Sequence, residues 1–198
     1  MATSRLPQFN LNVARARELV GLGVAVSGIT SGSVNSSDMY RSALVQGVAA
    51  LDAYVHDVVL DFTIEILRGI RPPGTAGRIG LHFGAVCDLL NAPGAVEFEL
   101  MARELVNQRL SAETFQKPDD IAKAFASVGV NGIWRGAFGI GSGITTELNL
   151  VVGRRNQVVH RCDMDPAGVL GILPMEDLDA LAAIGTVETV VQGIDAYL

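Results

Sequence analysis

One apolar stripe constrains the fold more than any other feature of this chain. Between residues 38 and 68, an apolar residue recurs every three or four positions: Leu44, Val48, Leu51, Val55, Val58, Phe62 and Ile66. This spacing places all seven on one face of an α-helix. Gly69 and the Pro72-Pro73 pair end the helix near Arg68, and a helix of this length spans about 45 Å. The stripe therefore predicts a helical bundle assembled around one long helix.

The rest of the chain is also typical of helices. Turn-forming residues separate helices predicted over 9–28, 78–90, 95–110, 117–128, 145–161 and 175–198, with a short helix between 131 and 142. Ser37 or Asp38 is expected to cap the long helix, and Asp119 the helix that follows Lys117. The strict alternation of a half-buried strand is absent from the sequence. The predicted fold class is all-α, a bundle of about five or six helices.

Length and composition favour a single domain over residues 1–198, with an N-terminal helix and loop (1–37) and a core bundle (38–198). Apolar residues make up 49% of the chain and charged residues 18%, so part of the apolar surface is expected to lie between subunits. No apolar run reaches the length of a membrane span. The apolar segment 19–29 is expected to belong to an amphipathic first helix rather than to a signal sequence.

Charge and cysteine content exclude several classes of protein. A formal net charge of −6 argues against a protein that coats nucleic acid nonspecifically, although a local basic cleft remains compatible with it. The two cysteines, Cys87 and Cys162, form neither a disulfide framework nor a zinc motif. Reduced thiols are usual in the cytoplasm, and the sequence predicts a cytoplasmic protein.

No cofactor or metal is predicted. The glycines of Gly139-Ile-Gly141-Ser-Gly143 lack dinucleotide-loop spacing and follow no predicted strand, so they indicate a turn. Asp57, Asp61 and Glu65 recur every four residues, which is typical of a solvated helix face and a weak indication of a divalent-ion site. The three histidines of the chain do not pair at ligand spacing.

The richest chemistry lies in Arg154-Arg155-Asn156-Gln157-Val158-Val159-His160-Arg161. Histidine can exchange a proton near neutral pH and arginine can hold a phosphate, which are the functions needed to cleave RNA without a metal. Asn156 and His160 share a helix face, whereas Arg155 and His160 are separated by about 140°. The long side chain of Arg155 can bring its guanidinium group closer to His160. The alternative is a histidine near a helix end beside surface arginines.

Three stretches give the chain a resemblance to the HEPN superfamily (higher eukaryotes and prokaryotes nucleotide-binding), and within it to the RiboL-PSP-HEPN ribonuclease branch. The stretches are 50–58 on the long helix, 121–138 with Gly129 and Trp134, and 154–160 followed by Asp163-Met164-Asp165-Pro166 and a closing helix. Their order resembles that of the family over residues 38–198.

The resemblance implies a dimeric bundle that sets two motifs across one cleft, and a metal-independent endoribonuclease acting as a toxin or antiphage defence effector. It implies that Arg155 and His160 are catalytic, with Asn156 as the accompanying polar residue, and that an antitoxin or defence-system protein is a partner. Arg154 and Arg161 make the motif more basic, which suits an RNA substrate. Arg161 departs from relatives, in which a small or acidic residue often follows the histidine. The alternative function is a noncatalytic helical module that binds a protein or a nucleotide.

Overall fold

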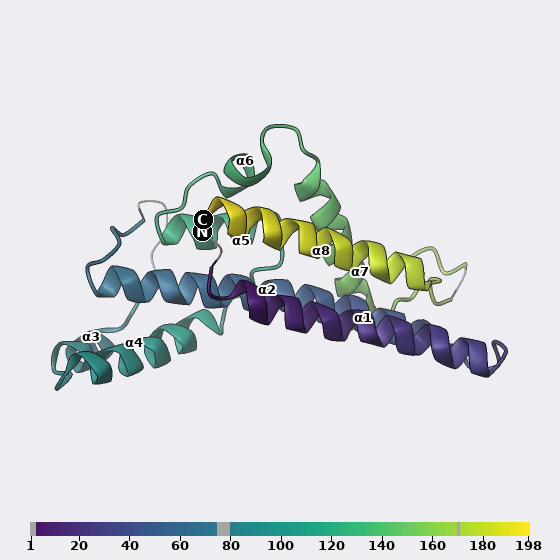
Figure 1. Ribbon diagram of the computed structural model, residues 1–198, viewed down its shortest axis with the longest axis horizontal. Coiled ribbons are helices and arrows are strands. Elements are labelled where there is room, and N and C mark those ends of the chain that lie inside the picture. The colour runs from purple at the N-terminus through teal and green to yellow at the C-terminus, as the bar shows by residue number, and fades with distance from the viewer. Residues whose placement is uncertain (1–2, 75–79, 170) are drawn as a thin grey trace.

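The computed structural model describes residues 3–74, 80–169 and 171–198, and these residues contain eight α-helices and no strand (Figure 1). The helices are α1 (Leu6–Ile29), α2 (Ser37–Leu67), α3 (Phe83–Leu90), α4 (Ala95–Leu110), α5 (Pro118–Ser127), α6 (Ile133–Phe138), α7 (Ile144–Arg161) and α8 (Asp177–Tyr197). The all-α prediction is confirmed. The expected five or six helices are too few, because the short helices α3 and α6, of 8 and 6 residues, are separate elements.

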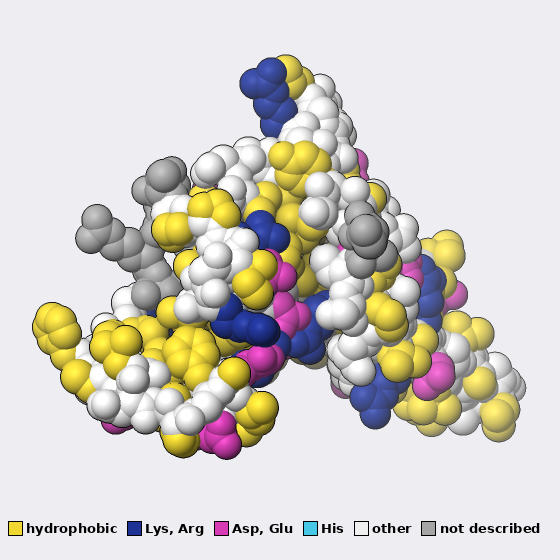
Figure 2. All heavy atoms as spheres, turned by 60° about the vertical axis from the view of Figure 1, so that its left-hand side comes forward, with side chains coloured by type: hydrophobic (Ala, Val, Ile, Leu, Met, Phe, Trp, Pro, Cys, Tyr) yellow, Lys and Arg dark blue, Asp and Glu magenta, His cyan; other side chains and the backbone are white. Residues whose placement is uncertain are grey.

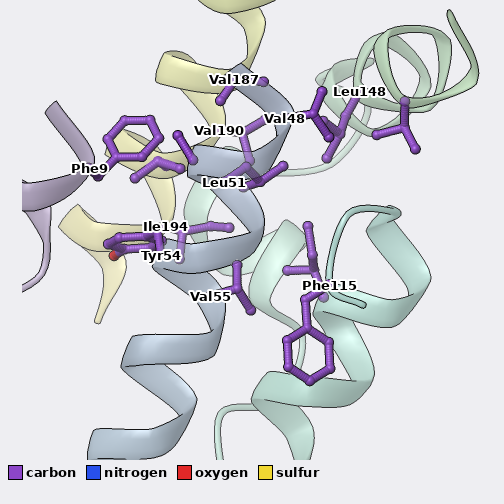
Figure 3. Packing of buried hydrophobic residues seen from close by; sticks show 14 of the residues in the cluster. Phe9, Val48, Leu51, Tyr54, Val55, Phe115, Leu148, Val187, Val190 and Ile194 are labelled. Atoms are coloured by element: carbon purple, nitrogen blue, oxygen red, sulfur yellow. The ribbon is translucent and has the colours of Figure 1, made fainter. Parts of the chain in front are cut away.

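Helices α1, α2 and α8 form the centre of the molecule. α1 and α2 make an antiparallel hairpin, and α8 lies along both, so that Thr3 comes beside the end of α8 (Figure 1). Phe9 of α1, Tyr54 of α2 and Ile194 of α8 meet in the core (Figure 3). The predicted stripe of α2 faces this core: its first five members are buried and its last two, Phe62 and Ile66, are partly buried.

A buried carboxylate joins the three central helices. Asp195 of α8 is 2% exposed and accepts hydrogen bonds from the Thr3 backbone N–H, 3.0 Å away, and from the Tyr54 hydroxyl, 2.8 Å away. Burial and the adjacent Asp195 carboxylate raise the pKa of Tyr54, so the phenol stays protonated and donates. This network fixes the segment that precedes α1 against the end of α8.

Two predicted helix caps are wrong. Ser36 occupies the cap position of α2, and the side chains of Ser37 and Asp38 instead accept hydrogen bonds from Arg41. Lys117 occupies the cap position of α5, and Asp119 lies within the first turn after Pro118. In both helices the predicted cap lies within two residues of the actual one. Arg41 engages the predicted cap residues of α2, and Pro118 at the first helical position sets the start of α5.

The predicted helix 78–90 begins only at Phe83, where the His82 ring accepts a hydrogen bond from the Ala85 N–H; residues 78–79 lie outside the described part of the chain. Helix α4 has the predicted bounds, and α7 begins one residue before the predicted start. Leu178, in the first turn of α8, is 68% exposed and takes no part in the core.

Helices α3 and α4 form a separate lobe on the second half of α2. Their inner faces contribute Leu89 and Ala102 to a small apolar cluster with Ile64 of α2. Figure 2 shows this lobe at the lower left, with hydrophobic side chains over much of its surface.

By length and composition α2 is also apolar enough to cross a membrane. In the fold, however, 56% of that apolar window is buried against the other helices, as in the core helix of a bundle.

Candidate functional site

The arginine–histidine motif lies on the second half of α7. Ile144, Leu148 and Val152 form the buried face of this helix, against α2 and α8. The turn before α7 uses Gly139, Gly141 and Gly143 at φ values of 76°, 80° and 75°. This backbone region strongly favours glycine, so the glycines serve the chain reversal that starts α7.

At its other end, α7 stops in a strained turn closed by a buried carboxylate. Cys162 and Asp163 have φ values of 51° and 56°, which are uncommon for residues other than glycine. Asp163 is fully buried, and its Oδ2 accepts hydrogen bonds from Arg41 Nε and Arg154 Nη2, each at 2.8 Å. Two arginines on different helices therefore compensate one buried negative charge.

The same two arginines hold the chain that follows α7. Arg41 donates to the Leu173 carbonyl at 2.6 Å, and Arg154 donates to the Pro174 carbonyl at 2.9 Å. The Leu173 N–H in turn donates to the Asp163 carbonyl at 2.9 Å. We call Arg41, Arg154 and Asp163 the carboxylate clamp, because together they fix the 163–174 loop against the ends of α2 and α7.

Arg155 has a different environment from its neighbour Arg154. It is half-buried and its Nη1 donates to Asn156 Oδ1 at 3.0 Å. No carboxylate in the described part of the chain pairs with it, and its buried Nε finds no hydrogen-bond partner there. The structure thus brings two of the three predicted catalytic residues together and leaves the charge of Arg155 uncompensated.

His160 and Arg161 end α7 and are both exposed. Their side chains make no hydrogen bond or ion pair with any described residue. No hydrogen bond joins His160 to Arg155, and residues five apart point about 140° apart on a helix. A hollow of 340 Å³ beside α7 is lined by Leu150, Val151 and Arg154 but by neither Arg155 nor His160. Within one copy of the chain, this hollow therefore holds Arg154 of the motif but not the predicted catalytic pair.

The other two histidines have structural partners. His82 caps α3, as described above. His56, on α2, contacts the Asp52 carbonyl at 2.8 Å and the Leu110 carbonyl at 3.2 Å, and its ring lies 4.3 Å from that of Phe115. Burial of the ring lowers its pKa, but the hydrogen bonds and charge of Asp52 outweigh burial, so the pKa of His56 lies above its ordinary value.

The acidic stripe of α2 pairs with arginines that the sequence pattern did not reveal. Asp61 accepts hydrogen bonds from Arg5 and Arg103, and Glu65 accepts one from Arg71 at 2.9 Å. Burial raises the pKa of Asp61, but the two guanidinium groups outweigh it and the net shift is downward. These pairs line a hollow of 490 Å³ (Figure 2). No group of three or more potential metal ligands occurs among the described residues.

Sequence reasoning missed Arg41 and Asp163. Asp163 directly follows the motif helix, which is a weak indication of a role there, but nothing in the spacing links it to Arg41, 122 residues away. Of the two arginines expected to bind substrate, Arg154 is engaged in the carboxylate clamp and Arg161 is exposed to solvent.

No protein-family model, curated protein or solved structure matches the chain.

Proposed function

We propose that this protein is a metal-independent endoribonuclease with a HEPN-like bundle, in which Arg155, Asn156 and His160 act on the phosphodiester. The observation that carries the proposal is the uncompensated charge of Arg155. Its neighbour Arg154 is neutralised by Asp163, whereas Arg155 has no carboxylate partner among the described residues. Leaving a buried donor unsatisfied costs about 1–3 kcal/mol, and a catalytic role or a bound group is one explanation for such an atom.

The chemistry follows from the residue types. RNA carries a 2′-hydroxyl beside each phosphodiester, and a base that removes its proton lets the oxygen attack phosphorus and expel the 5′-oxygen. Arg155 would stabilise the charge that develops on the phosphorane oxygens. Asn156 accepts from Arg155 Nη1 and so restricts the guanidinium to one side of α7.

His160 would serve as the base or as the acid for the leaving group, a contribution of about 10²–10⁴-fold. Two copies would supply two histidines, so that the base and the acid come from different subunits. Several exposed apolar residues around the motif support an interface there: Leu150 and Val159 on α7, and Val169 and Ile172 on the loop after it. The proposed assembly is a homodimer through α7.

In this proposal the protein acts in the cytoplasm as a toxin or defence effector. Its substrate is RNA, and its partner is an antitoxin or another defence-system protein. In a chain with a net charge of −6, local contacts at the motif would have to provide the affinity for RNA, because the overall field repels it.

The test is a product analysis. Purified protein is incubated with total cellular RNA, and with one sequence prepared both as RNA and as DNA, in excess EDTA. We expect cleavage of RNA alone, leaving a 2′,3′-cyclic phosphate and a 5′-hydroxyl. Cleavage of the DNA, or activity that EDTA removes and magnesium restores, would contradict the mechanism. Absence of cleavage in every reaction would favour the noncatalytic binding module.

A further inference from the structure

The α3–α4 lobe carries an exposed apolar face that nothing in the described fold covers. Phe83, Val86 and Leu90 of α3 are 91%, 38% and 80% exposed, and Val96 and Leu100 of α4 are 69% and 64% exposed. Residues 83, 86 and 90 follow helical spacing, as do 96 and 100, so each helix presents one apolar stripe outward. We call these five residues the lobe face; Figure 2 shows hydrophobic side chains over this lobe.

Both helices of the lobe are apolar on two sides. Ala85 and Leu89 of α3, and Ala102 and Val106 of α4, are buried on the inner side. Inner packing therefore cannot explain why the outer side is apolar as well. A helix that is apolar all round is normally buried, and grouped exposed apolar residues mark interaction sites.

The unpaired charges beside the lobe face are acidic. Arg103 follows Leu100 by three residues on α4, but it pairs with Asp61 and Glu99, and Arg68 also pairs with Glu99. Glu97 and Glu104 of α4 are exposed and make no ion pair within the described part of the chain. On the helix both lie within about 80° of the stripe formed by Val96 and Leu100. One flank of the apolar face is therefore acidic and uncompensated.

We propose that the lobe face is a docking site for a cationic amphipathic helix of another protein. Apolar stripes on two adjacent helices offer a surface on which a third helix can pack, and lysine or arginine on its flank would meet Glu97 and Glu104. The acidic flank disfavours two other occupants, a second copy of this chain and an anionic lipid surface. A symmetric second copy would bring like charges together, and anionic lipid would be repelled.

The direct test uses three labelled peptides and fluorescence anisotropy with the whole protein. One peptide places leucine on one helical face and lysine on the other, the second replaces lysine by glutamate, and the third scrambles the first. We expect tight binding of the first peptide alone. The double variant Phe83→Ser/Leu90→Ser should weaken that binding at least about tenfold. The matched control Leu11→Ser/Leu22→Ser, which alters residues 61% and 52% exposed on α1, should leave it within about twofold.

A charge reversal adds a gain of function. Glu97→Lys/Glu104→Lys should lose the lysine peptide and bind the glutamate peptide. Equal binding of the scrambled peptide, or equal losses in the lobe and control variants, would overturn the proposal. It would also fail if Phe83→Ser/Leu90→Ser dissociated a dimer of the wild type, or abolished its co-sedimentation with phosphatidylcholine–phosphatidylglycerol vesicles. None of these outcomes depends on ribonuclease activity.

Discussion

Arg154 Nη2 lies 2.8 Å from the fully buried Oδ2 of Asp163, nine residues later in the chain. Arg155, the next residue after Arg154, has no carboxylate partner within the described part of the chain. Two adjacent arginines of one motif therefore have different functions: one stabilises the turn after α7, and the other keeps its charge available for a ligand.

This difference predicts opposite behaviour of two neighbouring variants. Arg154→Ala should lower the free energy of unfolding by about 1–3 kcal/mol, because Asp163 loses a charged hydrogen-bond partner. Arg155→Ala should not lower it, because the variant removes a buried donor that has no partner, and should lower RNA cleavage at least about 10²-fold. Chemical denaturation and a cleavage assay on the same preparations measure both. Equal stability losses in the two variants would remove the distinction.

The carboxylate clamp predicts a larger effect at its centre. Asp163→Asn should destabilise the fold by about 3–5 kcal/mol, because Arg41, which is largely buried, and Arg154 lose their compensating charge together. Urea denaturation of Asp163→Asn, with Asp88→Asn at an exposed position outside the clamp as control, measures this loss. A loss below about 1 kcal/mol would mean that the clamp contributes little to the fold.

The long helices and their bounds could be predicted because each carries a local periodic pattern. Helix α4 has its predicted bounds and α2 agrees within one residue, since glycine and proline end these patterns in the sequence itself. The actual cap positions, Ser36 and Lys117, could not be predicted from local rules. Ser37 is taken by Arg41, whose position is set by a tertiary contact with Asp163.

The motif residues were found in the sequence, but their environments were not. The sequence does not show which of the two adjacent arginines pairs with a carboxylate. That pairing depends on the turn at Cys162 and Asp163, whose backbone is left-handed, and on Arg41 from α2. Likewise the acidic residues of α2 had the spacing of a solvated face, and only the fold brought Arg5, Arg71 and Arg103 to them.

His56 predicts a pH dependence of stability. Its pKa in the folded protein lies above the ordinary 6.5, so its stabilising contribution is complete below that value and is lost as the pH rises through the folded pKa. The stability difference between wild type and His56→Gln should therefore shrink as the pH rises above 6.5. Thermal unfolding at a series of pH values measures it. A difference that grows with pH would contradict the raised pKa.

Asp52, the partner of His56, predicts a loss of stability at acidic pH. Burial raises its pKa, but hydrogen bonds from His56, the Phe115 N–H and Gln116 outweigh burial and lower the pKa below 3.8. Its contribution is present above that value and disappears on acidification through the folded pKa. Asp52→Asn should therefore differ most from wild type above about pH 4, and a constant difference down to strongly acidic pH would contradict this assignment.

The proposed dimer has a direct test in solution. Light scattering at micromolar concentration should show a dimer for the wild type and a monomer for Leu150→Glu, which places a charge at a 70% exposed position of α7. Leu11→Glu, on α1, is the control and should remain dimeric. A monomeric wild type, or equal behaviour of the two variants, would count against an interface on α7.

The central claim is that His160 takes part in cleaving RNA. The most direct measurement compares the initial rates at which purified wild type, His160→Ala and His56→Ala cleave labelled RNA, with melting temperatures recorded alongside. The account predicts that His160→Ala loses at least about 10²-fold in rate at an unchanged melting temperature, because its side chain is exposed, and that His56→Ala stays within a few-fold. A His160→Ala protein that cleaves RNA as fast as wild type, or that melts well below it, would contradict the assignment.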